Sequence, residues 1–162
     1  MLVQASRDTG RDANVMNGER PAEGVVIVRG TAEGFAQEIV AGSHRFLSDE
    51  PARAGGTDTG PTPYDLLLAS LGSCTSMTLA MYARRKQWPL QRVTVRLRHS
   101  REHAEDCAAC ETSDARLTVI ERDIALDGAL NADQRARLLA IASRCPVHLT
   151  LSSQIDIRTK LE

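Results

Sequence analysis

Residues 62–89 read TPYDLLLASLGSCTSMTLAMYARRKQWP, and they predict the central element of the fold. Thr62 is a good N-cap, Pro63 fits the first helical position, and Asp65 stands three residues after the cap, as in a capping box. The helix is expected to end at about Gln87, because the Trp-Pro pair that follows disfavours helical backbone angles. This stretch therefore predicts one long helix.

The middle of this helix, from Leu66 to Ala83, carries no charged residue. It is nevertheless too polar for a membrane span of roughly 20 apolar residues, because small polar residues and glycine are spread along it: Ser70, Gly72, Ser73, Thr75, Ser76 and Thr78. A helix buried in the core of a globular protein fits this composition better. The N-terminus is polar and lacks the apolar segment of a secretory signal, so we expect a cytoplasmic protein.

Composition predicts a globular protein with an aliphatic core. Of the 162 residues, 42% are hydrophobic and 25% are charged, whereas aromatic residues make up only 3%. The net charge of −1 argues against non-specific nucleic-acid binding, which needs a basic excess. Residues 1–20 hold few large apolar side chains and are predicted to be a disordered tail, while residues 21–162 are predicted to form a single domain.

Strands are expected on both sides of the long helix. Short apolar or alternating runs predict them at residues 24–30, 35–40, 44–47, 92–99, 117–126 and 155–158. Asn131 is a good N-cap for a second helix that runs to about Ser143. Neighbouring strands joined by short turns favour antiparallel pairing, so the predicted fold class is α+β rather than parallel α/β.

Cys74 lies in the middle of the long helix. Free cysteine is often buried and inert, but Ser70, Met77 and Thr78 lie about one turn away, so this face is not purely aliphatic. The residues alone leave open whether Cys74 is an inert core thiol or a reactive one.

Cys145 has a stronger local argument for reactivity. Pro146 favours the first position of a helical turn, which places Cys145 at the N-cap, where backbone N–H groups and the helix dipole favour a thiolate. Either Arg144 or His148 would add positive charge. The alternative is a cysteine that only fills a helix junction. If the protein is an enzyme, the sulfur atoms of Cys74 and Cys145 are the best candidates for its chemistry.

A third group of candidate residues is His103, Cys107 and Cys110, which place three soft metal ligands on one short stretch. Structural zinc sites usually have four ligands, and His99 or Glu111 would supply the fourth. A Cys-x-x-Cys pair also cycles between dithiol and disulfide, and a purely structural role is the remaining alternative. The sequence contains no motif typical of phosphate loops, dinucleotide binding, zinc proteases or serine hydrolases.

Four blocks of sequence occur together and in order. They are Asp49-Glu50-Pro51; Gly55-Gly56 with Gly60-Pro61, Pro63 and Asp65-Leu66-Leu67; Gly72, Cys74 and Ser76-Met77-Thr78-Leu79; and Cys145-Pro146-Val147-His148 with Thr150-Leu151. Together they resemble the OsmC/Ohr family of osmotically inducible and organic hydroperoxide resistance proteins. The resemblance runs from about Gly24 to Leu161 and is closest to the OsmC-like branch.

This resemblance implies an α+β homodimer with intertwined subunits, in which antiparallel sheets wrap around two long central helices. It also implies thiol-dependent reduction of organic hydroperoxides and hydrogen peroxide in an oxidative stress response. Cys74 would be the thiolate that attacks peroxide and becomes a sulfenic acid, and Cys145 would then form a disulfide with it. A dithiol such as a protein-bound lipoyl group would restore the pair, and the peroxidase step would require no cofactor.

In the family's peroxidases an arginine holds the thiolate, and a glutamate shortly before the first cysteine holds that arginine. Tyr64 stands at the position of this glutamate, so Asp65 is either its replacement or only a helix cap. The arginine would come from the N-terminal strands and loops, where Arg29 and Arg45 are candidates and Arg45 is the one assigned.

Two other functions are compatible with the same fold. One is the binding of a small apolar ligand without catalysis. The other is a stress protein that a metal such as zinc stabilises at His103, Cys107 and Cys110.

Overall fold

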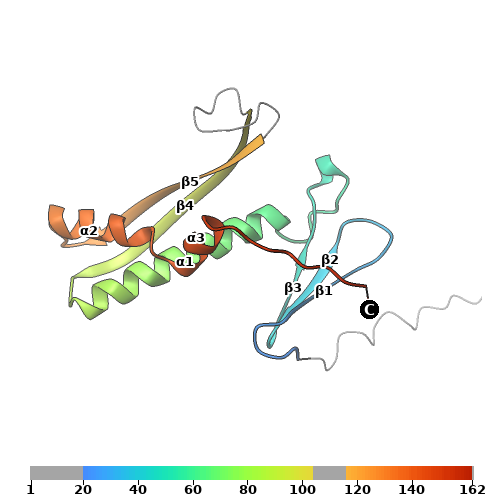
Figure 1. The fold of residues 1–162 in the computed structure, drawn as a ribbon, viewed down its shortest axis with the longest axis horizontal. Helices are drawn as coiled ribbons and strands as arrows, with labels where there is room; N and C mark the ends of the chain where they lie inside the picture. Colours follow the sequence, from blue (N-terminus) through green and yellow to red (C-terminus); the bar gives the residue numbers. More distant parts are fainter. Residues whose placement is uncertain (1–19, 104–115, 162) are drawn as a thin grey trace, which may run out of the picture. The chain divides into compact units, whose positions relative to one another are not determined.

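The computed structural model describes residues 20–103 and 116–161. The chain divides into two compact units, Met1–Thr62 and Pro63–Glu162, each of which contains antiparallel strands (Figure 1). With its helices, this confirms the predicted α+β class. The tail predicted for residues 1–20 lies outside the described residues except for Arg20, and the single domain at residues 21–162 stays a prediction.

The first unit contains a three-stranded antiparallel sheet. Its strands pair in the order β1 (Val26–Gly30), β2 (Gln37–Ala41) and β3 (His44–Ser48). In the tight turn between β2 and β3, Gly42 has a φ of 62°, a left-handed conformation that glycine adopts without steric cost. The prediction of three N-terminal strands is therefore confirmed, with slightly different ends.

One buried carboxylate, that of Asp49, organises the loop that follows β3. It accepts hydrogen bonds from the hydroxyl and backbone N–H of Thr57 at 2.6 and 2.9 Å, and from the same groups of Thr59 at 3.0 and 3.2 Å. The Thr57 hydroxyl is the strongest influence on the pKa of Asp49. Burial opposes it, but the backbone N–H groups of Thr59, Glu50 and Thr57 add to it and hold the pKa well below its usual range.

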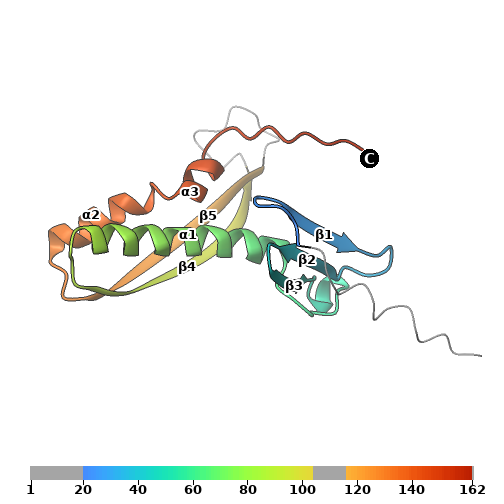
Figure 2. The ribbon, with the colours of Figure 1, turned by 90° about the horizontal axis from the view of Figure 1, so that it is seen from below.

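The second unit is built around a long helix and a long hairpin. α1 (Pro63–Arg85) runs alongside the antiparallel hairpin of β4 (Leu90–His103) and β5 (Arg116–Gly128) (Figure 1, Figure 2). Two further helices, α2 (Ala132–Ala142) and α3 (Pro146–Leu151), also contact α1. These elements confirm the predicted long helix, the strand pair and the second helix.

The two faces of the hairpin differ in polarity. The inward-facing positions of β4 are Val93, Val95 and Leu97, whereas Arg98 on the other face forms ion pairs with Glu121 and with Asp123. A Cβ atom at Gly72 of α1 would lie only 2.8 Å from Leu97 Cδ1. Glycine at this position therefore allows the helix to approach the apolar face of β4 closely.

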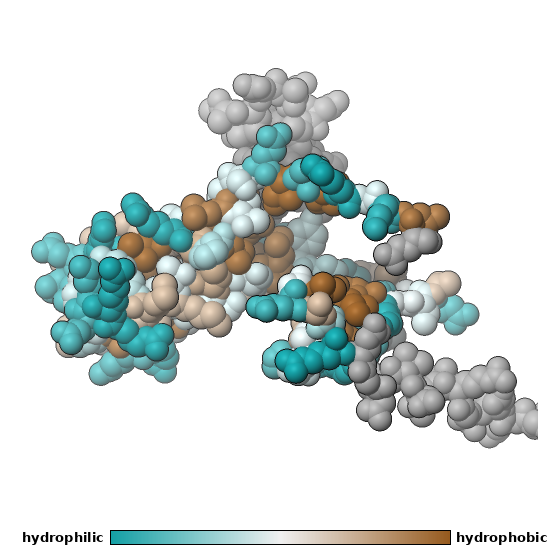
Figure 3. All heavy atoms as spheres, turned by 60° about the horizontal axis from the view of Figure 1, so that its bottom comes forward, coloured by the Kyte–Doolittle hydropathy of each residue, from teal (hydrophilic) through white to brown (hydrophobic). Residues whose placement is uncertain are grey.

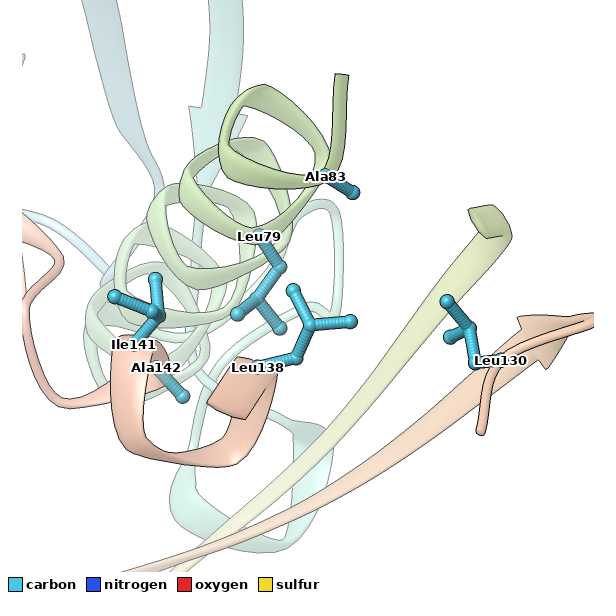
Figure 4. Packing of buried hydrophobic residues seen from close by; sticks show 6 residues of the cluster. All are labelled: Leu79, Ala83, Leu130, Leu138, Ile141 and Ala142. Atoms are coloured by element: carbon cyan, nitrogen blue, oxygen red, sulfur yellow. The ribbon is translucent and has the colours of Figure 1, made fainter. Parts of the chain in front are cut away.

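The core of the second unit lies between α1 and α2. Figure 4 shows Leu79 of α1 pointing toward Leu138 of α2, and the buried cluster consists of Leu79, Ala83, Leu130, Leu138, Ile141 and Ala142. By length and composition alone, α1 would be able to cross a membrane. Its packing against β4, α2 and α3 is that of the core helix expected from the sequence.

The strand predicted at residues 155–158 is wrong. This stretch has no regular secondary structure, and Ile155 and Ile157 are 52% and 83% exposed. A strand needs a neighbour for its backbone N–H and C=O groups, and no strand of the described chain pairs with these residues. The alternation of Ile, Asp, Ile and Arg alone was insufficient to define a strand.

We predict that Asp49→Asn lowers stability in a pH-dependent way. Because folding lowers the pKa of Asp49 from its ordinary value of 3.8, the carboxylate contributes stability above that value and loses it as the pH falls toward the folded-state pKa. Urea unfolding should show a clear difference between wild type and variant at about pH 7 and a smaller difference at about pH 3. The same difference at both pH values would contradict this account.

We predict that Leu138→Ala lowers the free energy of unfolding by about 3 kcal/mol, because it opens a cavity in the core. The neighbouring Leu139 is 64% exposed, whereas Leu138 is fully buried, so Leu139→Ala is a matched control with an expected loss below about 0.5 kcal/mol. Denaturant unfolding measures both values. Equal losses in the two variants would show that the core is elsewhere.

Candidate active site

Cys145 occupies the N-cap of α3, with Pro146 at the start of the helix. Its Sγ accepts a hydrogen bond from the backbone N–H of His148 at 3.3 Å, and its side chain is fully buried. Proline favours this geometry because its fixed φ suits the first helical turn and its missing N–H removes no hydrogen bond there. The N-cap position predicted for Cys145 is confirmed.

Thr75 brings α1 into contact with this sulfur. Its Oγ1 lies 3.6 Å from Cys145 Sγ, and both residues are fully buried. The hydroxyl also donates to the carbonyl oxygen of Leu71 at 2.8 Å, one helical turn earlier. The oxygen therefore lies at the point where α1 meets the start of α3.

Arg122 reaches the same point from β5. Its Nη1 donates to Thr75 Oγ1 at 2.9 Å and to the carbonyl oxygen of Ala142 at 3.2 Å. In the hairpin register Arg122 pairs with Leu97, so it occupies a position on the half-buried face of the strand. Its guanidinium group links β5, α1 and the end of α2.

Cys74 is the residue before Thr75 on α1, and its side chain is partly exposed. The Cys74 side chain is one of the groups that lower the pKa of the Cys145 thiol, and its neighbour Thr75 lies 3.6 Å from that sulfur, so the two thiols lie close together. Both cysteines are free thiols in this structure. Of the residues predicted for the site, these two are brought together.

The surroundings of Cys145 favour its ionised form. Burial raises the pKa of the thiol and is the largest single influence. It is outweighed by the Thr75 hydroxyl, the backbone N–H of His148, the Cys74 side chain and the positive charge of Arg122, so the pKa of the thiol lies below its ordinary value of 9.0. His148 thus contributes its backbone amide, and Arg122 supplies the charge that the sequence assigned to Arg144 or His148.

The other predicted site residues lie in different surroundings. Arg29 and Arg45 both belong to the first unit, where they form ion pairs with Glu38 at 3.5 and 3.3 Å. In the second unit, Asp65 lies in the first turn of α1 and borders a groove lined by Leu68, Ala69, Gly72, Ser73, Ser76, Val95 and Leu97. The roles assigned to Arg45 and Asp65 stay predictions.

Tyr64, at the position of the expected glutamate, stacks on His99 with ring centroids 4.5 Å apart. His99 was one of the residues considered as a fourth zinc ligand. Cys107 and Cys110 lie outside the described residues, as does the side chain of His103. Within the described part of the chain, no group of three or more His, Cys, Asp or Glu residues is arranged to hold a metal ion.

Sequence reasoning missed Arg122 and Thr75, although one signal was present for the arginine. On β5 the apolar residues Ile120, Ile124 and Leu126 alternate with exposed ones, and Arg122 occupies the same face as these apolar residues. A charged residue on the buried face of an amphipathic strand requires a partner. Thr75 has no comparable signal, because a threonine in a helix is common.

Solved structures share this fold. The chain is similar to the OsmC like protein from Mycoplasma pneumoniae, with a TM-score of 0.63 and 16% identity over 84% of this chain and 89% of that chain. It is similar to the organic hydroperoxide resistance protein OsmC from Legionella pneumophila, with a TM-score of 0.59 and 18% identity over 82% of this chain and 90% of that chain. It is also similar to the organic hydroperoxide resistance protein OhrB of Bacillus subtilis, with a TM-score of 0.56 and 20% identity over 85% of this chain and 96% of that chain.

A family model described as OsmC-like protein matches residues 56–160, which is more than half of the chain. No curated protein matches the sequence. The matched segment covers α1 to α3 and therefore contains Cys74, Thr75, Arg122 and Cys145. The chain belongs to the OsmC-like protein family, as its sequence blocks predicted.

Proposed function

We propose that the protein reduces organic hydroperoxides and hydrogen peroxide, with Cys74 and Cys145 as the reacting pair. The observation that carries the proposal is the placement of a partly exposed thiol, Cys74, directly before Thr75, whose hydroxyl lies 3.6 Å from the sulfur of the buried Cys145. Membership of the OsmC-like family supports it, as do similar structures named organic hydroperoxide resistance proteins.

The difference in solvent exposure between the two cysteines assigns their roles in this proposal. A peroxide arriving from solution meets Cys74, which is partly exposed, whereas Cys145 is fully buried. Cys145 is therefore suited to react with an intermediate that forms on Cys74. This is the same division into attacking and resolving cysteine that the family resemblance implies.

The first proposed step is attack by the Cys74 thiolate on one peroxide oxygen. The O–O bond breaks, the leaving oxygen takes a proton and departs as alcohol or water, and Cys74 becomes a sulfenic acid. The Cys145 thiolate then attacks the Cys74 sulfur, hydroxide leaves and takes a proton to become water, and a disulfide forms. The two sulfur atoms supply both electrons, so neither step needs a metal or an organic cofactor.

A dithiol then restores the two thiols in the proposed cycle. A lipoyl group is a suitable reductant because its two thiols close into a stable cyclic disulfide after the exchange. Within the second unit, Arg122 provides positive charge beside Cys145.

A homodimer is the assembly that we propose for this function. Met77 and Met81 lie one turn apart on α1 and are 69% and 62% exposed, and Figure 3 shows apolar side chains, in brown, at the surface of the described chain. Large apolar side chains at a surface are typical of protein interfaces. A second copy of the chain would cover this face of α1.

We predict that Met77→Glu/Met81→Glu shifts the protein from dimer to monomer, because two charges would be buried in the interface. Sedimentation velocity of wild type and variant measures the change. Ala140→Glu places a charge on a small exposed residue of α2 and serves as the control that stays dimeric. A monomeric wild type at micromolar concentration would contradict the proposed assembly.

We predict that the wild type consumes cumene hydroperoxide with dihydrolipoamide, and that Cys74→Ser lowers this rate at least about 100-fold, since the attacking sulfur is lost. Cys145→Ser should accumulate a sulfenic acid that dimedone labels. Cys107→Ser/Cys110→Ser is the matched control and should keep the activity.

Full activity in Cys74→Ser would overturn the proposed function. A wild type without turnover that co-purifies with a small apolar molecule would instead support the ligand-binding alternative. Loss of activity and of bound zinc in the Cys107→Ser/Cys110→Ser control would support the metal-stabilised alternative.

A further inference from the structure

The two sulfur atoms differ in both access and support. Cys145 is fully buried, and its sulfur lies beside the Thr75 hydroxyl and accepts a hydrogen bond from the backbone N–H of His148. The positive charge of Arg122 also acts on this sulfur. Cys74, the residue before Thr75 on α1, is partly exposed. A disulfide between them would therefore present two unequal sulfur atoms to an attacking thiolate.

The Thr75 hydroxyl can serve both protonation states of Cys145. A threonine hydroxyl has one hydrogen to donate and two lone pairs that accept. Arg122 Nη1 occupies one lone pair, at 2.9 Å. When Cys145 is a thiol, its hydrogen is directed to the second lone pair, and the hydroxyl donates to the carbonyl oxygen of Leu71.

Ionisation of Cys145 reverses the direction of one hydrogen bond. The thiol hydrogen is gone, so the Thr75 hydroxyl rotates and donates to the sulfur instead. The carbonyl oxygen of Leu71 is not left without a partner, because it also accepts the helical N–H from four residues later. Arg122 keeps its hydrogen bond to Thr75 in both states, and its positive charge stays near the sulfur.

We propose that Thr75 and Arg122 make Cys145 the leaving sulfur when a Cys74–Cys145 disulfide is reduced, so that the external dithiol attacks Cys74. This inference rests on the disulfide of the proposed function. It identifies Arg122 as a positioning residue that acts through Thr75 and through its charge. The sulfur with the more stable thiolate leaves faster in thiol–disulfide exchange, and access to the two sulfur atoms favours the same direction.

The exchange balances in two steps. A thiolate of the reductant bonds to Cys74 Sγ, the S–S bond breaks, and its electron pair stays on Cys145 as a thiolate. The second thiolate of the reductant then attacks the reductant sulfur of this mixed disulfide. Cys74 is released as a thiolate, and the reductant leaves as a cyclic disulfide after giving up two electrons.

A trapping experiment reads the direction of attack. Full-length Cys107→Ser/Cys110→Ser protein is oxidised with diamide, so that the disulfide forms without peroxide, and is then treated with a monothiol and N-ethylmaleimide. Peptide mass spectrometry should find the monothiol on Cys74 and the maleimide on Cys145. The reverse pattern, or no Cys74–Cys145 disulfide after diamide, overturns the inference.

The roles of Arg122 and Thr75 are tested by the rate of disulfide reduction and by titration of the Cys145 thiol. Arg122→Gln should slow reduction of the diamide-formed disulfide by dihydrolipoamide about 3- to 10-fold, and Arg122→Lys should recover part of the rate because it keeps the charge. Arg96 pairs with Asp123 on the other face of the same hairpin, so Arg96→Gln is the matched control and should react like the parent protein.

Thr75→Val retains the shape of the side chain and tests the same inference if Arg122→Gln does not fold. It should also slow the reduction about 3- to 10-fold. In a Cys74→Ser/Cys107→Ser/Cys110→Ser background, thiolate absorbance near 240 nm should show the Cys145 pKa rising in both variants. The charged group that then acts on this sulfur is Arg122 of β5. Unchanged rates and an unchanged titration would overturn the role of the pair.

The two proposals fail in different ways. If peroxide forms no disulfide but the diamide-formed disulfide is reduced at Cys74, the proposed function fails and this inference stands. If peroxide forms the disulfide and the monothiol is found on Cys145, the proposed function stands and this inference fails.

Discussion

The hydrogen bond between Arg122 and the Thr75 hydroxyl connects the elements that form the candidate site. It joins β5 to α1, and the same guanidinium group binds the carbonyl oxygen of Ala142 at the end of α2. Thr75 in turn contacts Cys145 at the start of α3. A partly buried charge is stabilised by such partners, so these hydrogen bonds help to keep the four elements in register.

The core and the site lie along the same side of α1. Leu71, Thr75, Leu79 and Ala83 follow each other at intervals of four residues, and all are buried. Leu79 and Ala83 belong to the apolar cluster with α2, whereas Thr75 is a polar position in the same stripe. The packing that stabilises the second unit therefore also fixes where the Cys145 sulfur lies. Cys74, one residue before Thr75, reaches that sulfur from a position that is still partly exposed.

Local sequence signals predicted the elements that local interactions determine. The proline after Cys145 predicted its N-cap position, and Asn131 forms the capping box with Gln134 at the start of α2. Signals that depend on distant partners were weaker. Arg122 interacts with Thr75, 47 residues away in the chain, and only its place among apolar residues of β5 indicated a partly buried position. The stretch at 155–158 alternates like a strand, but the described chain provides no strand beside it.

The central claim is that Cys74 and Cys145 form a disulfide when the protein meets a hydroperoxide. Its most direct test is intact-mass and peptide mass spectrometry of the Cys107→Ser/Cys110→Ser protein after one equivalent of cumene hydroperoxide. The account predicts a protein lighter by two hydrogen atoms, with a Cys74 peptide linked to a Cys145 peptide. A protein of unchanged mass with two free thiols, or one that gains oxygen without a link between these cysteines, would contradict it.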